Sequence, residues 1–136
     1  MKCLLSLFLF VISIFGCNLT IPLADCTVDS NGTFKFIQIK ITNKTNPKES
    51  KVIIRGSASH RYHNQIFVNF LDNIKHNCND LYTNYDFKVL GGGRIRVYPY
   101  RVEIFGSSNM YGSCDNSLTS KLIKTCYPDN FQIDYN

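Results

Sequence analysis

Apolar and polar residues alternate along much of the chain, and this alternation predicts a sheet. Strands are predicted over residues 23–28, 33–42, 51–55, 86–97, 101–105 and 131–135. Period-two alternation places the apolar side chains of a strand on one face. Asn31-Gly32 lies between the first two strands, and this dipeptide favours a tight turn. The pattern therefore predicts that these two strands form a hairpin.

A second pattern, with apolar residues three or four positions apart, predicts helices. Residues 61–77 carry it most clearly, with one broad apolar stripe formed by Tyr62, Ile66, Phe67, Phe70, Leu71 and Ile74. A shorter helix is predicted to begin near residue 116 or 117, where Asn116 or Ser117 can cap it, and to end near residue 125. Residues 79–85 are polar and are predicted to form a loop.

Three glycines interrupt the strand predicted over residues 86–97. They are followed directly by an arginine, in the order Gly91-Gly92-Gly93-Arg94. Glycines within a strand pattern indicate a bulge, or a place where another backbone or a ligand comes close, although a simple turn has the same composition. The guanidinium of Arg94 suits a phosphate or carboxylate. The segment is therefore either a turn with a solvated charge or part of an anion site.

Two side chains have unusual positions in these patterns. Lys35 shares a strand face with Ile37, Ile39 and Ile41, so its amine either extends into solvent at the strand end or binds a ligand. His63 falls in the first turn of the long predicted helix, beside the apolar stripe. The helix dipole disfavours a charged imidazolium there. His63 is therefore either a neutral base or an exposed or capping residue.

The remaining candidate chemistry lies in one loop and one histidine pair. Residues 106–112 form a polar loop between two glycines, and such a loop either presents backbone N–H groups to an anion or only connects two elements. His60 and His63 are three residues apart, but no third ligand stands at a suitable spacing. No metal site is predicted.

Residues 1–16 have the composition of a secretory signal peptide. Lys2 is followed by an apolar run that ends at Gly16 and is too short to span a bilayer. We expect cleavage near this position and secretion of residues 17–136 without membrane insertion; a retained anchor is the alternative. The whole chain carries +5, and removing one lysine and no acid leaves +4. This charge fits small anionic ligands, and no nucleic-acid module is present.

Four cysteines lie beyond the cleavage region, at Cys26, Cys78, Cys114 and Cys126. In an oxidising compartment they allow three pairings. A Cys114–Cys126 bridge is disfavoured, because the helix predicted between them spans roughly 15 Å at ~1.5 Å per residue. Cys126 is expected to pair with Cys26 or Cys78, or to stay reduced. Asn-X-Thr sequons, consistent with a secreted glycoprotein, begin at Asn18, Asn31 and Asn43.

Several short motifs occur in an order and spacing that resemble the Janus/Ocnus family of protein histidine phosphatases. They are Gly32-Thr33-Phe34-Lys35-Phe36, Glu49-Ser50-Lys51, Ile54-Arg55-Gly56, Tyr62-His63, Leu90-Gly91-Gly92-Gly93-Arg94-Ile95, Phe105-Gly106, Tyr111-Gly112 and Tyr127-Pro128-Asp129. The resemblance implies a single α/β domain in which a mixed sheet of five to six strands is flanked by two helices. It also implies hydrolysis of phosphohistidine in proteins or peptides without metal or cofactor. We expect the chain to be a monomer.

The same resemblance implies roles for individual residues. His63 matches the catalytic histidine that activates the attacking water. Lys35 and Arg94 match the basic residues of the phosphate site, and Arg55 and Tyr62 match positions that shape it.

The polar loop matches the family less closely. Ser108 corresponds to the serine whose loop supplies hydroxyl and backbone donors, with Asn109 and Met110 beside it. However, Ser107, Asn109 and Met110 replace the aromatic residue, methionine and alanine that are usual there, and the larger Met110 could crowd the pocket. One alternative function is therefore a secreted protein of the same fold that binds phosphate or phosphopeptides with little catalysis. The other, a sex-regulated signalling protein, is implied only by the resemblance to family members of that kind.

Overall fold

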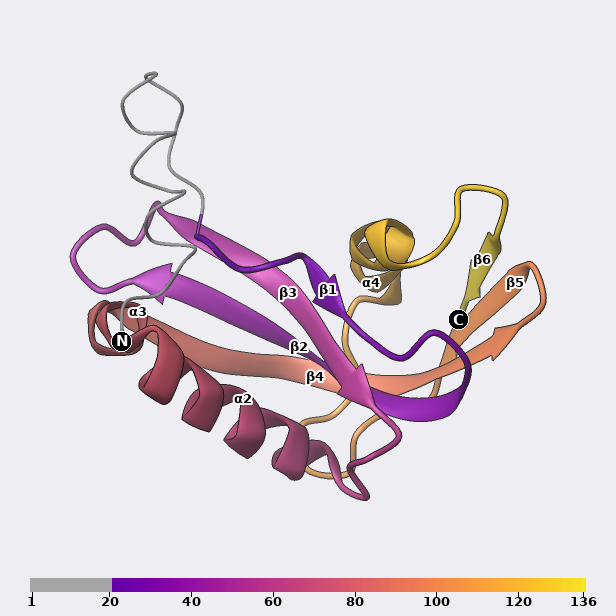
Figure 1. Cartoon of the computed structure of the whole chain (residues 1–136), viewed down its shortest axis with the longest axis horizontal. Coiled ribbons are helices and arrows are strands. Elements are labelled where there is room, and N and C mark those ends of the chain that lie inside the picture. The colour runs from indigo at the N-terminus through magenta and orange to yellow at the C-terminus, as the bar shows by residue number, and fades with distance from the viewer. Residues whose placement is uncertain (1–20) are drawn as a thin grey trace.

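A six-stranded mixed sheet runs through the computed structural model, which describes residues 21–136 (Figure 1). Its strands are β1 (Cys26–Thr27), β2 (Gly32–Asn43), β3 (Ser50–Ser57), β4 (Tyr85–Tyr98), β5 (Arg101–Phe105) and β6 (Gln132–Tyr135). Their order across the sheet is β1-β3-β2-β4-β5-β6. The inner strands pair antiparallel, whereas the two edge strands run parallel to their neighbours. The predicted α/β fold with a mixed sheet is confirmed.

Helices cover both faces of the sheet. They are α2 (His63–Asn77), α3 (Asn79–Asn84) and α4 (Asn116–Leu122), and α4 continues as the 3-10 helix η1 (Ile123–Cys126). Figure 1 shows α2 along one face and α4 on the other. The side chains of β2 alternate between two cores: Ile37 and Ile39 pack with α2, and Phe34 and Phe36 pack on the α4 side. The central strand is thus buried on both faces.

The predicted hairpin between the first two strands is wrong. Only Cys26–Thr27 is a strand in this region, and it pairs in parallel with β3. The antiparallel neighbour of β2 is β3, along a register that runs from Lys35↔Ser57 to Thr42↔Ser50. A two-residue strand cannot compete with that ladder. Gly32 still requires its glycine, because its φ of 82° lies in the left-handed region.

Two details of the helices also differ from the prediction. Residues 79–84, expected to be a loop, form the short helix α3, in which Leu81 is the buried residue. One apolar side chain produces no periodicity, so the pattern could not reveal this helix. Helix α4 is capped by Asp115, whose Oδ1 accepts hydrogen bonds from the backbone N–H groups of Ser117 and Leu118. Neither Asn116 nor Ser117 has the capping role.

A disulfide joins Cys26 in β1 to Cys126 in η1, which is one of the alternatives left open by the sequence. Cys114 is a free thiol in the part of the chain that the structure describes. Within the same part, no helix combines the length and apolar character needed to cross a membrane. The predicted signal peptide at residues 1–16 and the sequon at Asn18 lie outside the described residues.

Candidate anion-binding site

A pocket of about 250 Å³ opens at the N-terminus of α2, between the middle of the sheet and the loop after β5. Its lining comes from four separate segments of the chain: Lys35, Tyr62, His63, Asn64, Arg94, Ser107, Ser108, Asn109 and Met110. We call it the phosphate pocket, after the ligand expected from the sequence. All of the site residues predicted from the sequence line it, with the exception of Arg55. Asn64 was not predicted; its place next to His63 in the first helical turn was the signal available.

His63 is the first residue of α2, and its side chain is only 7% exposed. It lies on the buried stripe of the helix with Ile66, Phe70 and Ile74, and the prediction that it stands beside this stripe is wrong. Its Nε2 is 2.9 Å from the carbonyl oxygen of Gly93. A carbonyl can only accept, so Nε2 carries the hydrogen of a neutral ring and Nδ1 keeps the lone pair.

The glycine run makes room for this imidazole. A Cβ on Gly92 would lie 2.6 Å from the carbonyl oxygen of Phe36 and 2.9 Å from Cδ2 of His63. The register of β4 against β2 also shifts here, because the partners of Gln38 and Ile39 are Gly91 and Val89. The glycine run is therefore part of strand β4, with a bulge and a close contact to His63, and it is not a turn. This agrees with one of the two interpretations of the sequence.

Two cations face the pocket beside this imidazole. Lys35 and Arg94 are direct cross-strand partners on β2 and β4, so their side chains lie on the same face of the sheet. Within residues 21–136, neither forms an ion pair or a side-chain hydrogen bond. The pKa of His63 is lowered by its burial and by the positive charges of Lys35 and Arg94, against the opposing effect of the Gly93 carbonyl. A neutral imidazole beside two unpaired cations favours an anionic ligand.

The loop of residues 106–112 closes the other side of the pocket. The backbone N–H of Ser108 donates to Gly112 O at 3.1 Å, and its Oγ accepts from the N–H of Tyr111. Gly112 O also accepts from the N–H of Gly92 at 3.0 Å, which holds the loop against the glycine run. Ser108 therefore organises the loop through both its backbone and its hydroxyl group. The N–H groups of Asn109 and Met110, like those of Gly106 and Ser107, donate to no partner among the described residues.

The side chain of Met110 does not crowd the pocket. It is 67% exposed and lies at the rim, as does the half-exposed ring of Tyr62. An exposed methionine leaves the pocket open to an anion.

Arg55 is not part of this pocket. It lies on β3, and its Nη1 donates to Ala24 O and Ile54 O at 3.0 and 2.8 Å. Its guanidinium carbon is 5.6 Å from the ring centroid of Phe70, in the middle of α2. Burial lowers the pKa of Arg55 to about 10, although Asp25 opposes the shift. The structure places Arg55 in a separate hollow, whereas the sequence predicted that it shapes the site of His63.

The fold and the pocket define an α/β domain that presents a neutral, buried histidine and two cations to an anion. Sequence comparison supplies the family: the model of the Janus/Ocnus family matches residues 20–131. The chain is 30% identical over 112 residues to the 14 kDa phosphohistidine phosphatase of Homo sapiens, which covers 77% of this chain and 84% of that protein. It is 29% identical over 104 residues to the sex-regulated protein janus-A of Drosophila mauritiana. That alignment covers 75% of this chain and 71% of the janus-A protein. The chain belongs to the Janus/Ocnus family.

Proposed function

We propose that this protein hydrolyses phosphohistidine in proteins or peptides, without metal or cofactor. The observation that carries the proposal is the pocket in which the buried imidazole of His63 faces the unpaired cations Lys35 and Arg94. Relatives that are about 30% identical over most of the chain are named phosphohistidine phosphatase, which supports the same substrate class.

In this proposal His63 is the general base. Its Nε2–H is held by Gly93 O, so Nδ1 is the basic nitrogen. Nδ1 accepts a proton from water as the water oxygen attacks phosphorus. The phosphorus–nitrogen bond of the substrate breaks, and the departing imidazole nitrogen takes up the proton from His63. The products are histidine and inorganic phosphate, and a positioned base of this kind contributes ~10²–10⁴-fold to the rate.

The phosphoryl oxygens are held by the groups around His63. Lys35 and Arg94 supply positive charge, and the N–H groups of Asn109 and Met110 supply neutral donors. The N-terminus of α2 adds a partial positive charge at the same place. Donors fixed in position before the reaction stabilise the charge of the transition state without reorganisation.

Turnover of a phosphohistidine peptide tests the proposal. His63→Ala is expected to reduce kcat/KM by about 10²-fold or more, because it removes the base. His76→Ala is the matched control, since His76 is exposed at the other end of the same helix. The proposal fails if the wild-type protein is no faster than His63→Ala while both are folded by circular dichroism.

The alternative, a phosphate- or phosphopeptide-binding protein without turnover, is favoured by one observation. The N–H of Ser108 is used within the loop, which leaves fewer donors for a transition state than the pocket lining suggests. Calorimetry that detects phosphate binding, combined with no hydrolysis, selects this alternative. In it, Arg94→Gln abolishes binding and His63→Gln leaves it nearly unchanged.

We also propose that the chain is secreted after cleavage near residue 16 and acts as a monomer. The Cys26–Cys126 disulfide supports secretion, because disulfides persist in oxidising compartments. Expression in a secreting cell should give a product in the medium whose N-terminus begins close to residue 17. Light scattering should give the mass of one chain plus any glycan at the exposed Asn31. Retention of residues 1–16 on the secreted product would contradict the proposal.

A further inference from the structure

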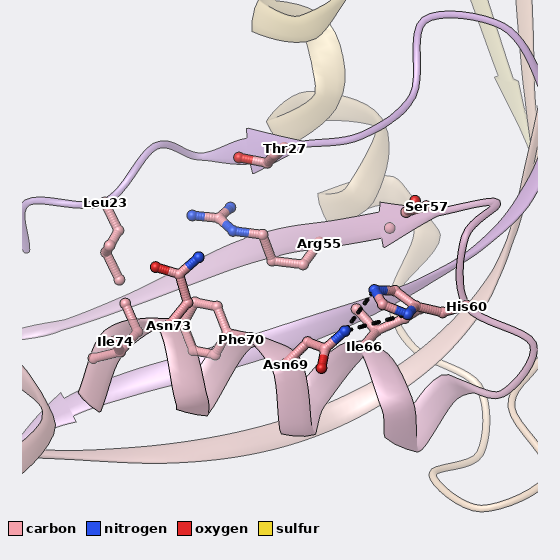
Figure 2. A pocket seen from close by; sticks show the side chains of 11 residues that line it. Leu23, Thr27, Arg55, Ser57, His60, Ile66, Asn69, Phe70, Asn73 and Ile74 are labelled. Atoms are coloured by element: carbon pink, nitrogen blue, oxygen red, sulfur yellow. Dashed lines mark hydrogen bonds between the residues drawn. The ribbon is translucent and has the colours of Figure 1, made fainter. Parts of the chain in front are cut away.

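The largest of the hollows described here, about 360 Å³, lies between α2 and the edge of the sheet formed by β1 and β3 (Figure 2). We call it the Arg55 hollow. Its floor is apolar and includes Leu23, Ile66 and Phe70, whereas Asn69 and Asn73 stand on its α2 side. One half-buried cation on an apolar floor, with amides beside it, is an arrangement that suits an anionic group carried on an apolar stem.

The guanidinium of Arg55 has donors to spare. Both of its hydrogen bonds, to Ala24 O and Ile54 O, are made by Nη1. No buried side-chain nitrogen or oxygen of the described residues lacks a partner, so the unbonded Nη2 and Nε of Arg55 must reach open space. Figure 2 shows the guanidinium directed toward Leu23 and Asn73, along the hollow.

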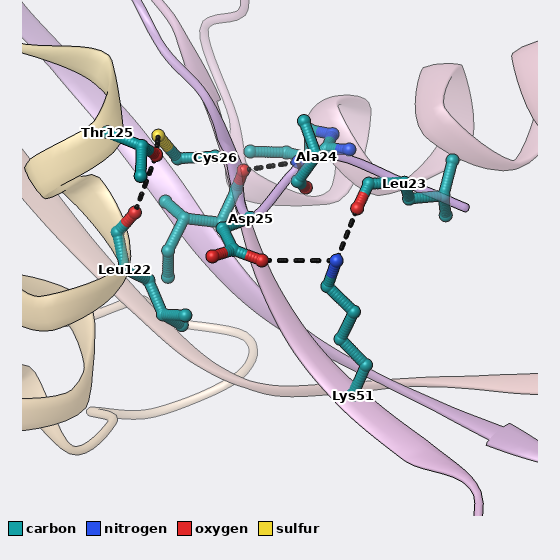
Figure 3. A network of polar contacts seen from close by, with 9 residues as sticks. Leu23, Ala24, Asp25, Cys26, Lys51, Leu122 and Thr125 are labelled. Carbon is teal, nitrogen blue, oxygen red and sulfur yellow. Dashed lines mark hydrogen bonds and ion pairs between the residues drawn. The ribbon is translucent and has the colours of Figure 1, made fainter. Parts of the chain in front are cut away.

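No carboxylate of the described residues neutralises this guanidinium within ion-pair distance. The nearest acid that influences it is Asp25, which instead pairs with Lys51 at 3.1 Å (Figure 3). The ammonium of Lys51 also donates to Leu23 O, in the segment that leads into β1. Arg55 therefore offers a planar pair of donors to a carboxylate from outside the chain.

A third hollow of about 300 Å³ shares lining residues with both of the others. It shares His60 with the Arg55 hollow, and it shares Lys35 and Arg94 with the phosphate pocket. The three hollows therefore adjoin one another. An extended polypeptide held at the phosphate pocket would reach Arg55 by passing over the third hollow.

We propose that Arg55 binds an acidic side chain of the same polypeptide whose phosphohistidine enters the phosphate pocket. The inference rests on the proposed function, and it adds a sequence preference to it. From His63 to Phe70, which lies under Arg55, α2 rises roughly 10 Å at ~1.5 Å per residue. An extended peptide covers this in about three residues at ~3.3 Å each. The acid is therefore expected three to four residues from the phosphohistidine.

Paired peptides test the preference directly. Each pair carries Glu or Gln at the third or fourth residue on either side of the phosphohistidine, and kcat/KM is measured for both members. For at least one pair the Glu peptide is expected to be roughly five- to tenfold better, as for a charge-assisted hydrogen bond that is partly exposed. A ratio near one at all four positions overturns the proposal.

Two variants keep the test specific. Arg55→Gln should remove the preference. Because Arg55 also binds the backbone oxygen of Ala24, just before β1, exposed Asn73 offers a second, safer variant. Asn73→Glu places a negative charge in the hollow and should remove or reverse the preference. Val68→Glu, which adds the same charge on the exposed side of α2, should retain it. If Asn73→Glu and Val68→Glu behave alike, the Arg55 hollow is not the binding site.

Small phosphoramidate separates this inference from the proposed function. It fills only the phosphate pocket, so its turnover should be the same in Asn73→Glu and wild type. If phosphoramidate is hydrolysed but the peptide ratio is one, the inference alone is wrong. If phosphoramidate is not hydrolysed, the proposed function fails, and calorimetric Kd values of the same Glu and Gln peptides then decide the inference: a ratio near one overturns it, and a ratio of five or more supports it.

Discussion

The imidazole of His63 owes its proposed reactivity to its neighbours. Burial and the charges of Lys35 and Arg94 lower its pKa below the ordinary value of 6.5. The ring is therefore neutral at pH 7, and a neutral ring can accept a proton from water. The same cations that bind the phosphoryl group thus also keep the base in its active form.

This arrangement predicts the pH dependence of the reaction. In the free enzyme kcat/KM should fall to half of its plateau value at a pH below 6.5, because half of His63 is protonated at its lowered pKa. Lys35→Gln removes one cation, which raises the pKa of His63 and moves this acidic limb to higher pH. Lys40→Gln, exposed on the opposite face of β2, should leave the limb in place. A limb that moves to lower pH in Lys35→Gln contradicts the assignment. The rates are measured with phosphoramidate at constant ionic strength.

Gly92 permits the contact between β4 and this imidazole, and Gly92→Ala tests it. The added methyl group would overlap the carbonyl oxygen of Phe36 and the ring of His63. We expect a loss of about 1–3 kcal/mol in the free energy of unfolding, as is usual for overpacking, and a fall of roughly tenfold or more in kcat as the base is displaced. Lys88→Ala on the same strand is the control, since Lys88 is exposed. Urea unfolding that gives equal stabilities for Gly92→Ala and wild type would contradict the role of the close contact.

At the scale of elements, the edge strand β1 is held by other segments more than by its own ladder. It contributes two residue pairs to β3. The Cys26–Cys126 disulfide also holds it. The two residues before it are held by the hydrogen bonds from Arg55 to Ala24 O and from the N–H of Ile54 to Asp25 O, and by the Lys51–Asp25 ion pair. The phosphate pocket, in contrast, is built on the long β2–β4 ladder and the start of α2. We therefore expect that a change at the β1 edge can lower the stability of the protein without changing catalysis at the phosphate pocket.

The double variant Cys26→Ala/Cys126→Ala tests this separation. The two cysteines are 100 residues apart, so the lost cross-link should lower the free energy of unfolding by about 3–5 kcal/mol. Turnover per folded molecule at 15 °C should remain within about twofold, because neither cysteine lines the phosphate pocket. Cys114→Ser, which removes a free thiol, is the control for sulfur loss. A double variant that stays fully stable but loses turnover would show that the edge governs the site.

At the scale of the whole molecule, the fold collects groups from distant parts of the chain. Lys35, His63, Arg94 and the loop of residues 106–112 lie on four different segments, and the sheet order β3-β2-β4-β5 brings them to one place. Because two of these groups are unpaired cations, their mutual repulsion costs stability until an anion binds. We therefore expect that an anion bound in the pocket stabilises the whole folded protein against unfolding.

Inorganic phosphate is expected to stabilise the protein by mass action, by about 2.7 kcal/mol when its concentration reaches 100 times Kd. Thermal unfolding should show a Tm that rises with phosphate at constant ionic strength. Arg94→Gln should abolish most of this rise, whereas Lys88→Gln, which removes one exposed charge from the same strand, should keep it. An equal rise in both variants would mean that the effect is not due to the phosphate pocket.

The sequence by itself determined the elements and most of the pocket. Strands, the long helix and the family motifs follow from short-range patterns, because side-chain periodicity and turn chemistry are local properties. The tertiary structure alone decided how these elements pair: β1 beside β3, Cys26 with Cys126, and Arg55 in a hollow apart from His63. It also decided that Gly93 O selects the tautomer of His63. These arrangements depend on which of several distant segments pairs with a given strand, fills a given cavity or forms a given hydrogen bond. Local sequence patterns do not contain that information.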